Sequence, residues 1–443
     1  MRPLINPRPE ARAHGHRGGI WWANPLSPIL ILVVPMMLAT YLIPSHVFLE
    51  QWKEPKFFGF DAMIRCAAAM VMFCIGALVA TRGRLGLAAK LEWPGLSPLA
   101  WEVLRRSFFT LYRLTCAAYA LWVGLALRNG LRPSTLLDTL RSQNTFSGTL
   151  KAQFVNVTGV TTLIELGIAA SVVGALLAVQ RDRGVSRRLA FLVLLATLRG
   201  FFLAERLAII EVVLPWLVIR SGQLATTRAR SARRILVRLG PIFAIPLLLV
   251  GFSLFEYSRS WSFAKTTTTD SFLQYSSYRL VGYYATSFNN GELYRITTDR
   301  TGRLPFDTVQ FLWQAPGLSS VISYEGVTGT PPRPDVLGTR SNPEFNNPGG
   351  ISGPFIDYGD VGGVLYFLLV GFVLGRLYVQ FAAGRIVGLL LYPVFFVGVL
   401  EVPRYLYWAQ GRVTPAIVAL MLVGLRITAH ARHARAMHLS LAA

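Results

Sequence analysis

The run FFGFDAMIRCAAAMVMFCIGALVA, at Phe57–Ala80, is long and apolar enough to cross a bilayer as one helix. A membrane-spanning helix needs about 20 mostly apolar residues, with a range of about 17–25. Comparable runs recur along the chain, which predicts an all-α integral membrane protein with about ten transmembrane helices. The predicted spans are Leu26–Ile43, Phe57–Ala80, Ser107–Leu127, Thr158–Val179, Leu189–Leu203, Leu207–Ile219, Leu239–Phe255, Gly362–Val379, Ile386–Leu400 and Val413–Leu425. The fifth and sixth are short and could instead form one bent hairpin.

The composition of the chain agrees with this class. It has 443 residues, of which 53% are hydrophobic and 15% charged, and its mean hydropathy is +0.45. Soluble domains have about 25% charged residues. The net charge of +22 lies mostly in short segments between apolar runs, where positive charge sets membrane orientation. No soluble basic domain remains, so a nucleic-acid partner is not expected.

The distribution of arginine predicts the topology. Basic residues gather in both tails and in alternate short connections, so both termini are expected on the cytoplasmic side. The predicted divisions are a basic tail (1–25), helices one to seven (26–255), a large outer loop with short helices (256–361), helices eight to ten (362–425) and a second basic tail (426–443). In a bacterium the outer loop would face the periplasm.

The loop from Glu256 to Asp360 has no membrane-spanning run and is rich in aromatic, polar and arginine residues. A long loop kept on one side of a membrane protein is where function is expected, and its positive charge predicts an anionic partner. A helix is predicted at Thr269–Asn290, capped by Thr269 or Asp270 and stopped by Asn289-Asn290-Gly291. A shorter helix is predicted at Asp307–Gln314.

Ionisable residues at membrane depth form the first candidate site. Arg199, Glu205, Arg206 and Glu211 lie within or between the fifth and sixth predicted spans. A charged side chain in a bilayer costs at least about 2.5 kcal/mol, so such residues are usually paired or face a polar cavity. Arg199 and Arg206 are seven residues apart and would share one face of a helix. They either bind substrate, or reach the membrane surface and pair with Glu205 or Glu211.

The stretch Tyr278–Gly291 combines Arg279, Tyr283, Asn289 and Asn290. Guanidinium groups bind phosphate oxygens bidentately, and tyrosine and amide groups suit a sugar surface. The alternative is an interfacial amphipathic helix with a belt of tyrosines. The residues alone leave both interpretations open.

Acidic residues at two helix junctions are candidate general bases. Asp357 and Asp360 precede the eighth predicted span, where Asp360 would more readily cap the helix. Glu401 and Arg404 lie in the turn before the tenth span and could equally form a solvated ion pair. Cysteine and histidine spacing predicts no zinc site, and no Asp-x-Asp pair occurs in the first outer loop. Neither a metal nor another cofactor is expected.

Four stretches resemble bacterial O-antigen polymerases, the Wzy-type oligosaccharide repeat unit polymerases. They are Ala204–Pro215, Glu256–Trp261, Tyr283–Gly291 and Pro354–Gly362, and the likeness extends over roughly Leu189–Arg412. The resemblance implies a multi-pass enzyme of the bacterial inner membrane whose active site faces the periplasm. Such an enzyme polymerises polyprenyl-pyrophosphate-linked oligosaccharides by transferring the growing glycan to a sugar hydroxyl of a new lipid-linked unit. Membrane lipid, a chain-length regulator and a flippase of the same pathway would be its partners.

This reaction assigns expected roles to the candidate residues. The pyrophosphate leaving group needs charge stabilisation, the acceptor hydroxyl needs a base, and the two substrates need alignment. Pyrophosphate and substrate binding is expected from Arg199, Arg206, Arg279, Arg259, Arg404, Tyr283, Asn289 and Asn290, and catalysis from Asp357, Glu401 and Glu205. The enzyme would be a metal-independent glycosyltransferase. The alternatives are an O-antigen-ligase-like transfer to a final acceptor, and a non-enzymatic flippase or transporter of lipid-linked sugars.

Overall fold

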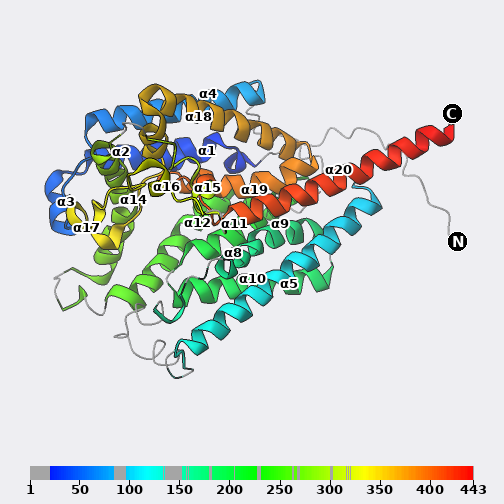
Figure 1. The fold of residues 1–443 in the computed structure, drawn as a ribbon, viewed down its shortest axis with the longest axis horizontal. Helices are drawn as coiled ribbons and strands as arrows, with labels where there is room; N and C mark the ends of the chain where they lie inside the picture. Colours follow the sequence, from blue (N-terminus) through cyan, green and yellow to red (C-terminus); the bar gives the residue numbers. More distant parts are fainter. Residues whose placement is uncertain are drawn as a thin grey trace.

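A computed structural model of the chain describes residues 20–83, 96–132, 134, 152–155, 157, 159–178, 182–203, 205–226, 231–261, 264–266, 270–299, 303–315, 317, 319 and 321–442. Every regular element in these ranges is helical (Figure 1). Five helices are long and apolar enough to cross a membrane, or six if the bent pair Leu26–Leu42 and Ser45–Gln51 forms one span. Two shorter apolar helices, Ile386–Glu401 and Thr414–His430, add to these. This is the architecture expected of a multi-pass membrane protein.

The elements fall into three groups along the chain. The first holds η1 (Trp21–Ala23), α1 (Leu26–Pro28), η2 (Ile29–Val33), α2 (Val34–Leu42), α3 (Ser45–Gln51), α4 (Phe60–Thr81), α5 (Pro98–Arg128), α8 (Val160–Ile164), α9 (Leu166–Ala178), α10 (Arg183–Phe202), α11 (Leu207–Thr226) and α12 (Ser231–Glu256). The second, called here the connecting segment (residues 256–361), holds η3 (Tyr257–Trp261), α14 (Phe272–Thr297), α15 (Gln310–Trp313), α16 (Tyr324–Thr328), α17 (Leu337–Arg340) and η4 (Pro343–Phe345). The third group holds α18 (Ser352–Ala382), α19 (Ile386–Glu401), η5 (Tyr407–Ala409) and α20 (Thr414–Ala442). The first turns of α18 overlap the last residues of the connecting segment.

The most enclosed helix is α9. Residues 166–177 are all buried, and the helix packs against α5, α10, α11, α19 and α20. A helix that is apolar on every side can be buried in this way. Figure 1 shows α17 beside α3 at the end of the bundle opposite the one toward which α20 extends, with α15 and α16 nearer the middle of the view.

Helices α4 and α18 approach each other at backbone distance. A methyl group added at Gly371 would lie 2.0 Å from the Phe73 carbonyl oxygen, and one added at Gly76 would lie 2.0 Å from the Leu368 carbonyl oxygen. Gly371 and Gly375 form a Gly-x-x-x-Gly pair, a pattern that allows membrane helices to pack closely. Each glycine is therefore required by its position in this helix pair.

Helix α12 contains Pro241, which has no backbone N–H to donate to the carbonyl of Val237 four residues earlier. The indole Nε1 of Trp22 donates to this carbonyl instead, at 2.9 Å, and Trp21 donates to the neighbouring carbonyl of Arg238 at 2.8 Å. The N-terminal tryptophans thus satisfy backbone groups at the proline and attach α12 to the bundle. The exposed side chains of α12 include Leu247, Val250 and Leu254.

The helix predicted at Thr269–Asn290 exists, but the prediction of both its ends was wrong. Helix α14 has 26 residues, begins after Ser271, whose hydroxyl accepts from the Gln274 N–H, and continues through Asn289-Asn290-Gly291 to Thr297. The asparagines do not end the helix because their amides bond to neighbouring segments, and Gly291 is needed for close contact with Ser352. The predicted helix at Asp307–Gln314 shortens to Gln310–Trp313.

Two other predicted boundaries change. Helix α10 begins at Arg183 instead of Leu189, because the Asp182 carboxylate accepts from the N–H groups of Gly184 and Val185. Helices α10 and α11 are separate and pack on each other. Helix α18 begins at Ser352 instead of Gly362 and bends at Gly359, whose φ of 74° is accessible mainly to glycine. Asp360 therefore starts the second half of α18 and not the whole helix.

We predict that Gly371→Ala destabilises the protein by about 1–3 kcal/mol, the usual cost of overpacking. The added methyl group would force α4 and α18 apart. Gly124→Ala on α5 is the matched control, since nothing lies within 4 Å of a methyl group there. The measurement is unfolding of purified protein in mixed micelles with increasing dodecyl sulfate. Equal midpoints for the two variants would contradict the close approach of the helices.

Candidate functional site

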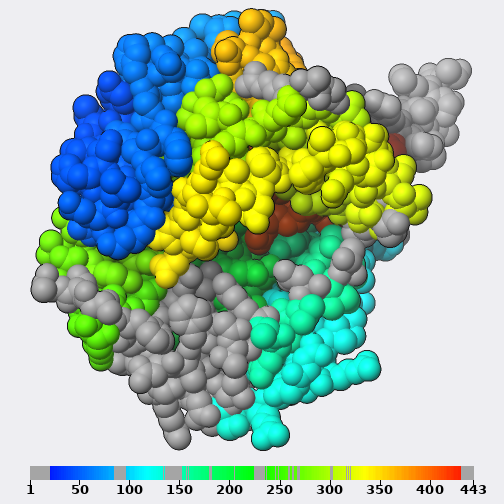
Figure 2. Space-filling model, turned by 60° about the vertical axis from the view of Figure 1, so that its left-hand side comes forward, coloured from blue at the N-terminus to red at the C-terminus, as the bar shows by residue number. Residues whose placement is uncertain are grey.

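A network of arginine–glutamate pairs joins helices and connections from distant parts of the chain. Its arginines are Arg199, Arg206, Arg279, Arg404 and Arg412, and its carboxylates are Glu165, Glu205, Glu211, Glu256, Glu344 and Glu401. In Figure 2, orange-red surface from the last part of the chain is visible at the base of a hollow, between the yellow part of the connecting segment and the green and teal helices. This network is the candidate functional site.

The first part of the network is centred on Glu256, the last residue of α12. Its carboxylate pairs with Arg206, which lies in the turn before α11, and with Arg279 of α14, whose Nε is 2.8 Å away. Arg279 also pairs with Glu344 at 2.6 Å. The Arg206 guanidinium lies over the ring of Phe252, 4.2 Å from its centroid. One buried carboxylate therefore orients two arginines from different helices.

The second part is centred on Glu165, at the junction of α8 and α9. Glu165 pairs with Arg199 at 2.9 Å and with Arg412 at 3.3 Å. Arg199 in the last turn of α10 also pairs with Glu205 at 2.6 Å, and Arg412 pairs with Glu211 of α11 at 2.7 Å. Glu165 thus links the α10–α11 turn to the connection before α20.

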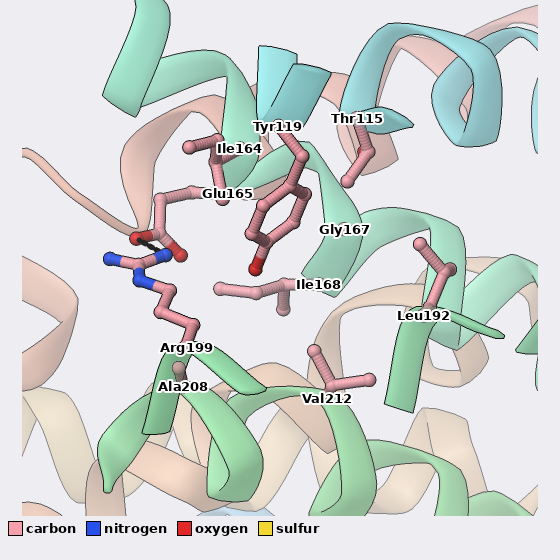
Figure 3. A pocket seen from close by; sticks show the side chains of 10 residues that line it. All are labelled: Thr115, Tyr119, Ile164, Glu165, Gly167, Ile168, Leu192, Arg199, Ala208 and Val212. Carbon is pink, nitrogen blue, oxygen red and sulfur yellow. Dashed lines mark ion pairs between the residues drawn. The ribbon is translucent and has the colours of Figure 1, made fainter. Parts of the chain in front are cut away.

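A small cavity lies beside the Glu165–Arg199 pair. Figure 3 shows this pair and the Tyr119 hydroxyl at one end of the cavity, with Leu192 and Val212 at the other. Its volume of about 10 Å³ is close to that required by one water molecule. Among the described residues, this inner end of the network therefore has no space for a larger ligand. Such a ligand would approach the network from its exposed side.

The third part surrounds Arg404 in the connection between α19 and α20. Arg404 pairs with Glu401 at 2.8 Å and donates to the Tyr283 hydroxyl at 3.2 Å. Its guanidinium lies 4.6 Å from the Tyr283 ring centroid, and Arg206 lies 5.6 Å from the same ring on α14. Burial, together with Glu401, raises the pKa of neighbouring Tyr284 to about 12, so its hydroxyl stays protonated at neutral pH.

The charges of the network nearly balance, since six carboxylates face five guanidinium groups. The carboxylates differ in exposure, however. Glu205 and Glu344 have 30% and 56% of their side-chain surface exposed, whereas Glu165, Glu211, Glu256 and Glu401 are buried. The four buried carboxylates fix the arginines, and the exposed Glu344 occupies a position beside Arg279 that an incoming anion could take.

Several guanidinium nitrogens of the network also have no hydrogen-bond partner. Arg206 Nη1, Arg404 Nε and Arg412 Nε are buried and have no hydrogen-bond partner. Buried donors without partners are uncommon and call for an explanation. A ligand with several acceptor oxygens could satisfy such donors.

Asp357, predicted as a base, lies on α18 away from this network. Its carboxylate accepts from the N–H groups of Phe306 and Thr308 at 2.9 and 2.8 Å and from the Thr308 hydroxyl at 2.8 Å. Arg303 Nε is 4.0 Å away. The contacts give Asp357 the role of attaching the connecting segment to α18.

Asn289 and Asn290 are fully buried. Asn289 accepts from the backbone N–H of Phe57 and Phe58 and donates to Glu54 and to the Pro55 carbonyl. The amide of Asn290 donates to the carbonyls of Phe345 and Asn347 and accepts from Ser341. In this structure both side chains are used inside the protein, where they hold α14 against the chain before α4 and against the region of η4.

The predicted binding residues therefore separate into two sets. The structure brings Arg199, Arg206, Arg279, Arg404, Tyr283, Glu205 and Glu401 together and places Asn289, Asn290 and Asp357 elsewhere. The side chain of Arg259 lies outside the described residues. The sequence prediction missed Glu165 and Arg412, although a glutamate within the apolar run Thr158–Val179 was a signal for a buried pair.

No group of three or more His, Cys, Asp or Glu side chains that could hold a metal ion occurs in the described part of the chain. No protein-family model matches the sequence, no curated protein matches it significantly, and no solved structure matches its fold.

We predict that Glu256→Gln destabilises the protein by about 3–5 kcal/mol, because it leaves two largely buried guanidinium groups without their shared counter-charge. Glu344→Gln is the matched control, since this exposed partner of Arg279 should contribute at most about 1 kcal/mol. The measurement is thermal unfolding of both purified variants in the same detergent. Similar midpoints would show that Glu256 does not organise the network.

Proposed function

We propose that the protein is a membrane glycosyltransferase that polymerises polyprenyl-pyrophosphate-linked oligosaccharides. The observation that carries the proposal is the convergence of five oriented arginines on one site in a chain with several apolar helices. A pyrophosphate attached to a lipid is a substrate that needs both features. The sequence resemblance to O-antigen polymerases supports the same reaction.

In the proposed reaction a sugar hydroxyl of the acceptor unit attacks the anomeric carbon of the growing glycan. The bond between that carbon and the pyrophosphate oxygen breaks, and the polyprenyl pyrophosphate leaves with the bonding electrons. Arg206 and Arg279, held by Glu256, would stabilise the charge that develops on the leaving group. Arg404 lies against the same tyrosine as Arg206 and would contact the second lipid-linked substrate.

The hydroxyl proton passes to a carboxylate base. Among the proposed bases Glu205 is favoured, because its side chain is 30% exposed and stands beside the arginines. Glu401 is buried and paired with Arg404, and Asp357 is enclosed by its three hydrogen bonds. Glu205 is therefore our first choice for the base and Glu401 the second.

The topology belongs to the proposal as well. Ten spans with cytoplasmic termini would place the connecting segment on the outer side of the inner membrane. Lipid-linked repeat units delivered there by a flippase would meet the arginine network, and a chain-length regulator would act on the product.

We predict that Arg206→Ala lowers the rate of glycan transfer by about 10²–10³-fold, the usual loss when one charge-stabilising group is removed. The assay combines purified protein with lipid-linked repeat units and resolves the lipid-linked glycans by length on a gel. Arg206→Lys should recover part of the rate. The control is Arg340→Ala, an exposed arginine of the same segment, which should polymerise normally.

Polymer of normal length and rate from Arg206→Ala would contradict the site. The same gel separates the related activities. A ligase-type enzyme would move preformed polymer to a final acceptor without lengthening it, and a transporter would leave single repeat units unchanged. Either result with authentic substrate would overturn the polymerase proposal.

Glu205→Gln should lower the rate by about 10²-fold or more, in the range of general-base catalysis. The measurement is the transfer rate of wild type, Glu205→Gln and Glu401→Gln with the same lipid-linked repeat units. An unchanged rate for Glu205→Gln together with a loss for Glu401→Gln would move the base to Glu401.

A further inference from the structure

A second basic region lies on the exposed face of the first half of α5, away from the network described above. Glu102, Arg105, Arg106, Phe109, Thr110 and Arg113 line a surface hollow of about 420 Å³. Helix α5 runs along one edge of the bundle (Figure 1) and is one of the apolar candidate spans. The hollow is large enough to receive a ligand of headgroup size.

The described residues that line this hollow carry more positive than negative charge. Three arginines line it, and the only acidic side chain among its lining residues is Glu102, which accepts from Arg106 Nε at 2.7 Å. A fourth arginine, Arg188 of α10, lies over the ring of Phe109 at 4.8 Å. The region therefore carries an excess of positive charge, in contrast to the paired arginines of the candidate functional site.

The position of Arg113 connects the hollow to the membrane. Arg113 follows Arg105 by eight residues, which is about 12 Å along a helix. Beyond it the side chains of Leu114, Leu121 and Leu127 are exposed, as expected of a lipid-facing surface. Helical side chains are directed back toward the N-terminus, so Arg113 extends toward the level of Arg106. A long arginine side chain near a helix end can extend to the membrane surface, where anionic headgroups lie.

We propose that this hollow binds the phosphate of an anionic glycerophospholipid, with the acyl chains along the exposed leucines of α5. Arginine binds phosphate oxygens bidentately, and basic pockets at membrane helices bind acidic headgroups. A membrane lipid is favoured over a soluble phosphate because α5 is an apolar candidate span with leucine side chains exposed beyond Arg113. This site is independent of the proposed glycosyltransferase activity and serves to anchor α5 in one leaflet.

The test uses the full-length protein purified in a mild detergent. Native mass spectrometry with added phosphatidylglycerol measures lipid binding for the wild type and for Arg105→Gln/Arg106→Gln/Arg113→Gln. The triple variant should bind about 10²-fold more weakly, since each arginine near a charged lipid contributes about a fivefold factor. The matched control is Arg128→Gln, an exposed arginine at the other end of the same helix, which should bind like the wild type.

Three results would overturn the proposal. They are equal phosphatidylglycerol binding by the triple variant, equal binding of phosphatidylcholine by the wild type, and full competition by inorganic phosphate at the same concentration. Arg113→Gln alone provides a second variant if the triple variant does not fold, and it should bind about fivefold more weakly. Polymerisation by the Arg113→Gln variant is measured separately and does not decide this site.

Discussion

The pairing of arginine with buried glutamate determines how this structure is organised. Glu256 and Glu165 each receive two arginines from separate elements, so two carboxylates connect α10, α12, α14, the α10–α11 turn and the connection before α20. A buried ion pair contributes little net stability, because desolvation offsets most of the attraction. Here the buried ion pairs fix positions instead. Because an unpaired buried charge is costly, each guanidinium is held in one position beside its carboxylate.

This geometry would allow the proposed site for a strongly anionic substrate to exist within an apolar bundle. Arginines placed there alone would be repelled by one another and would be poorly solvated. The buried glutamates remove that cost, and the exposed Glu344 occupies the open side beside Arg279. A pyrophosphate displacing Glu344 would meet donors that are already oriented, which is the condition for electrostatic stabilisation of a leaving group. On α5, by contrast, the partner of Arg106 is the exposed Glu102, so these arginines suit the lipid contact that we propose.

The surrounding fold keeps the network in place through contacts of a different kind. The glycines of α4 and α18 allow two backbones to touch, and the asparagines of α14 bond to the chain before α4 and to the region of η4. Asp357 holds the segment around Thr308 against α18. These contacts make α14 part of the bundle rather than a detached loop, so Arg279 and Tyr283 face the arginines of α10–α11 and of the α19–α20 connection.

The sequence by itself determined the helical, membrane-spanning class, because apolar runs of this length have few other stable environments. It also identified Arg199 and Arg206 as unusual, since charge is costly in a membrane, and Arg279 and Arg404 as candidate anion-binding residues of the outer side. Only the tertiary structure decided which carboxylate each arginine meets, because Glu165, Glu256 and Arg412 are distant in sequence from their partners. It also separated Asn289, Asn290 and Asp357 from the site, since a polar side chain in a sequence can equally bind a ligand or satisfy a buried backbone group, and only packing distinguishes the two.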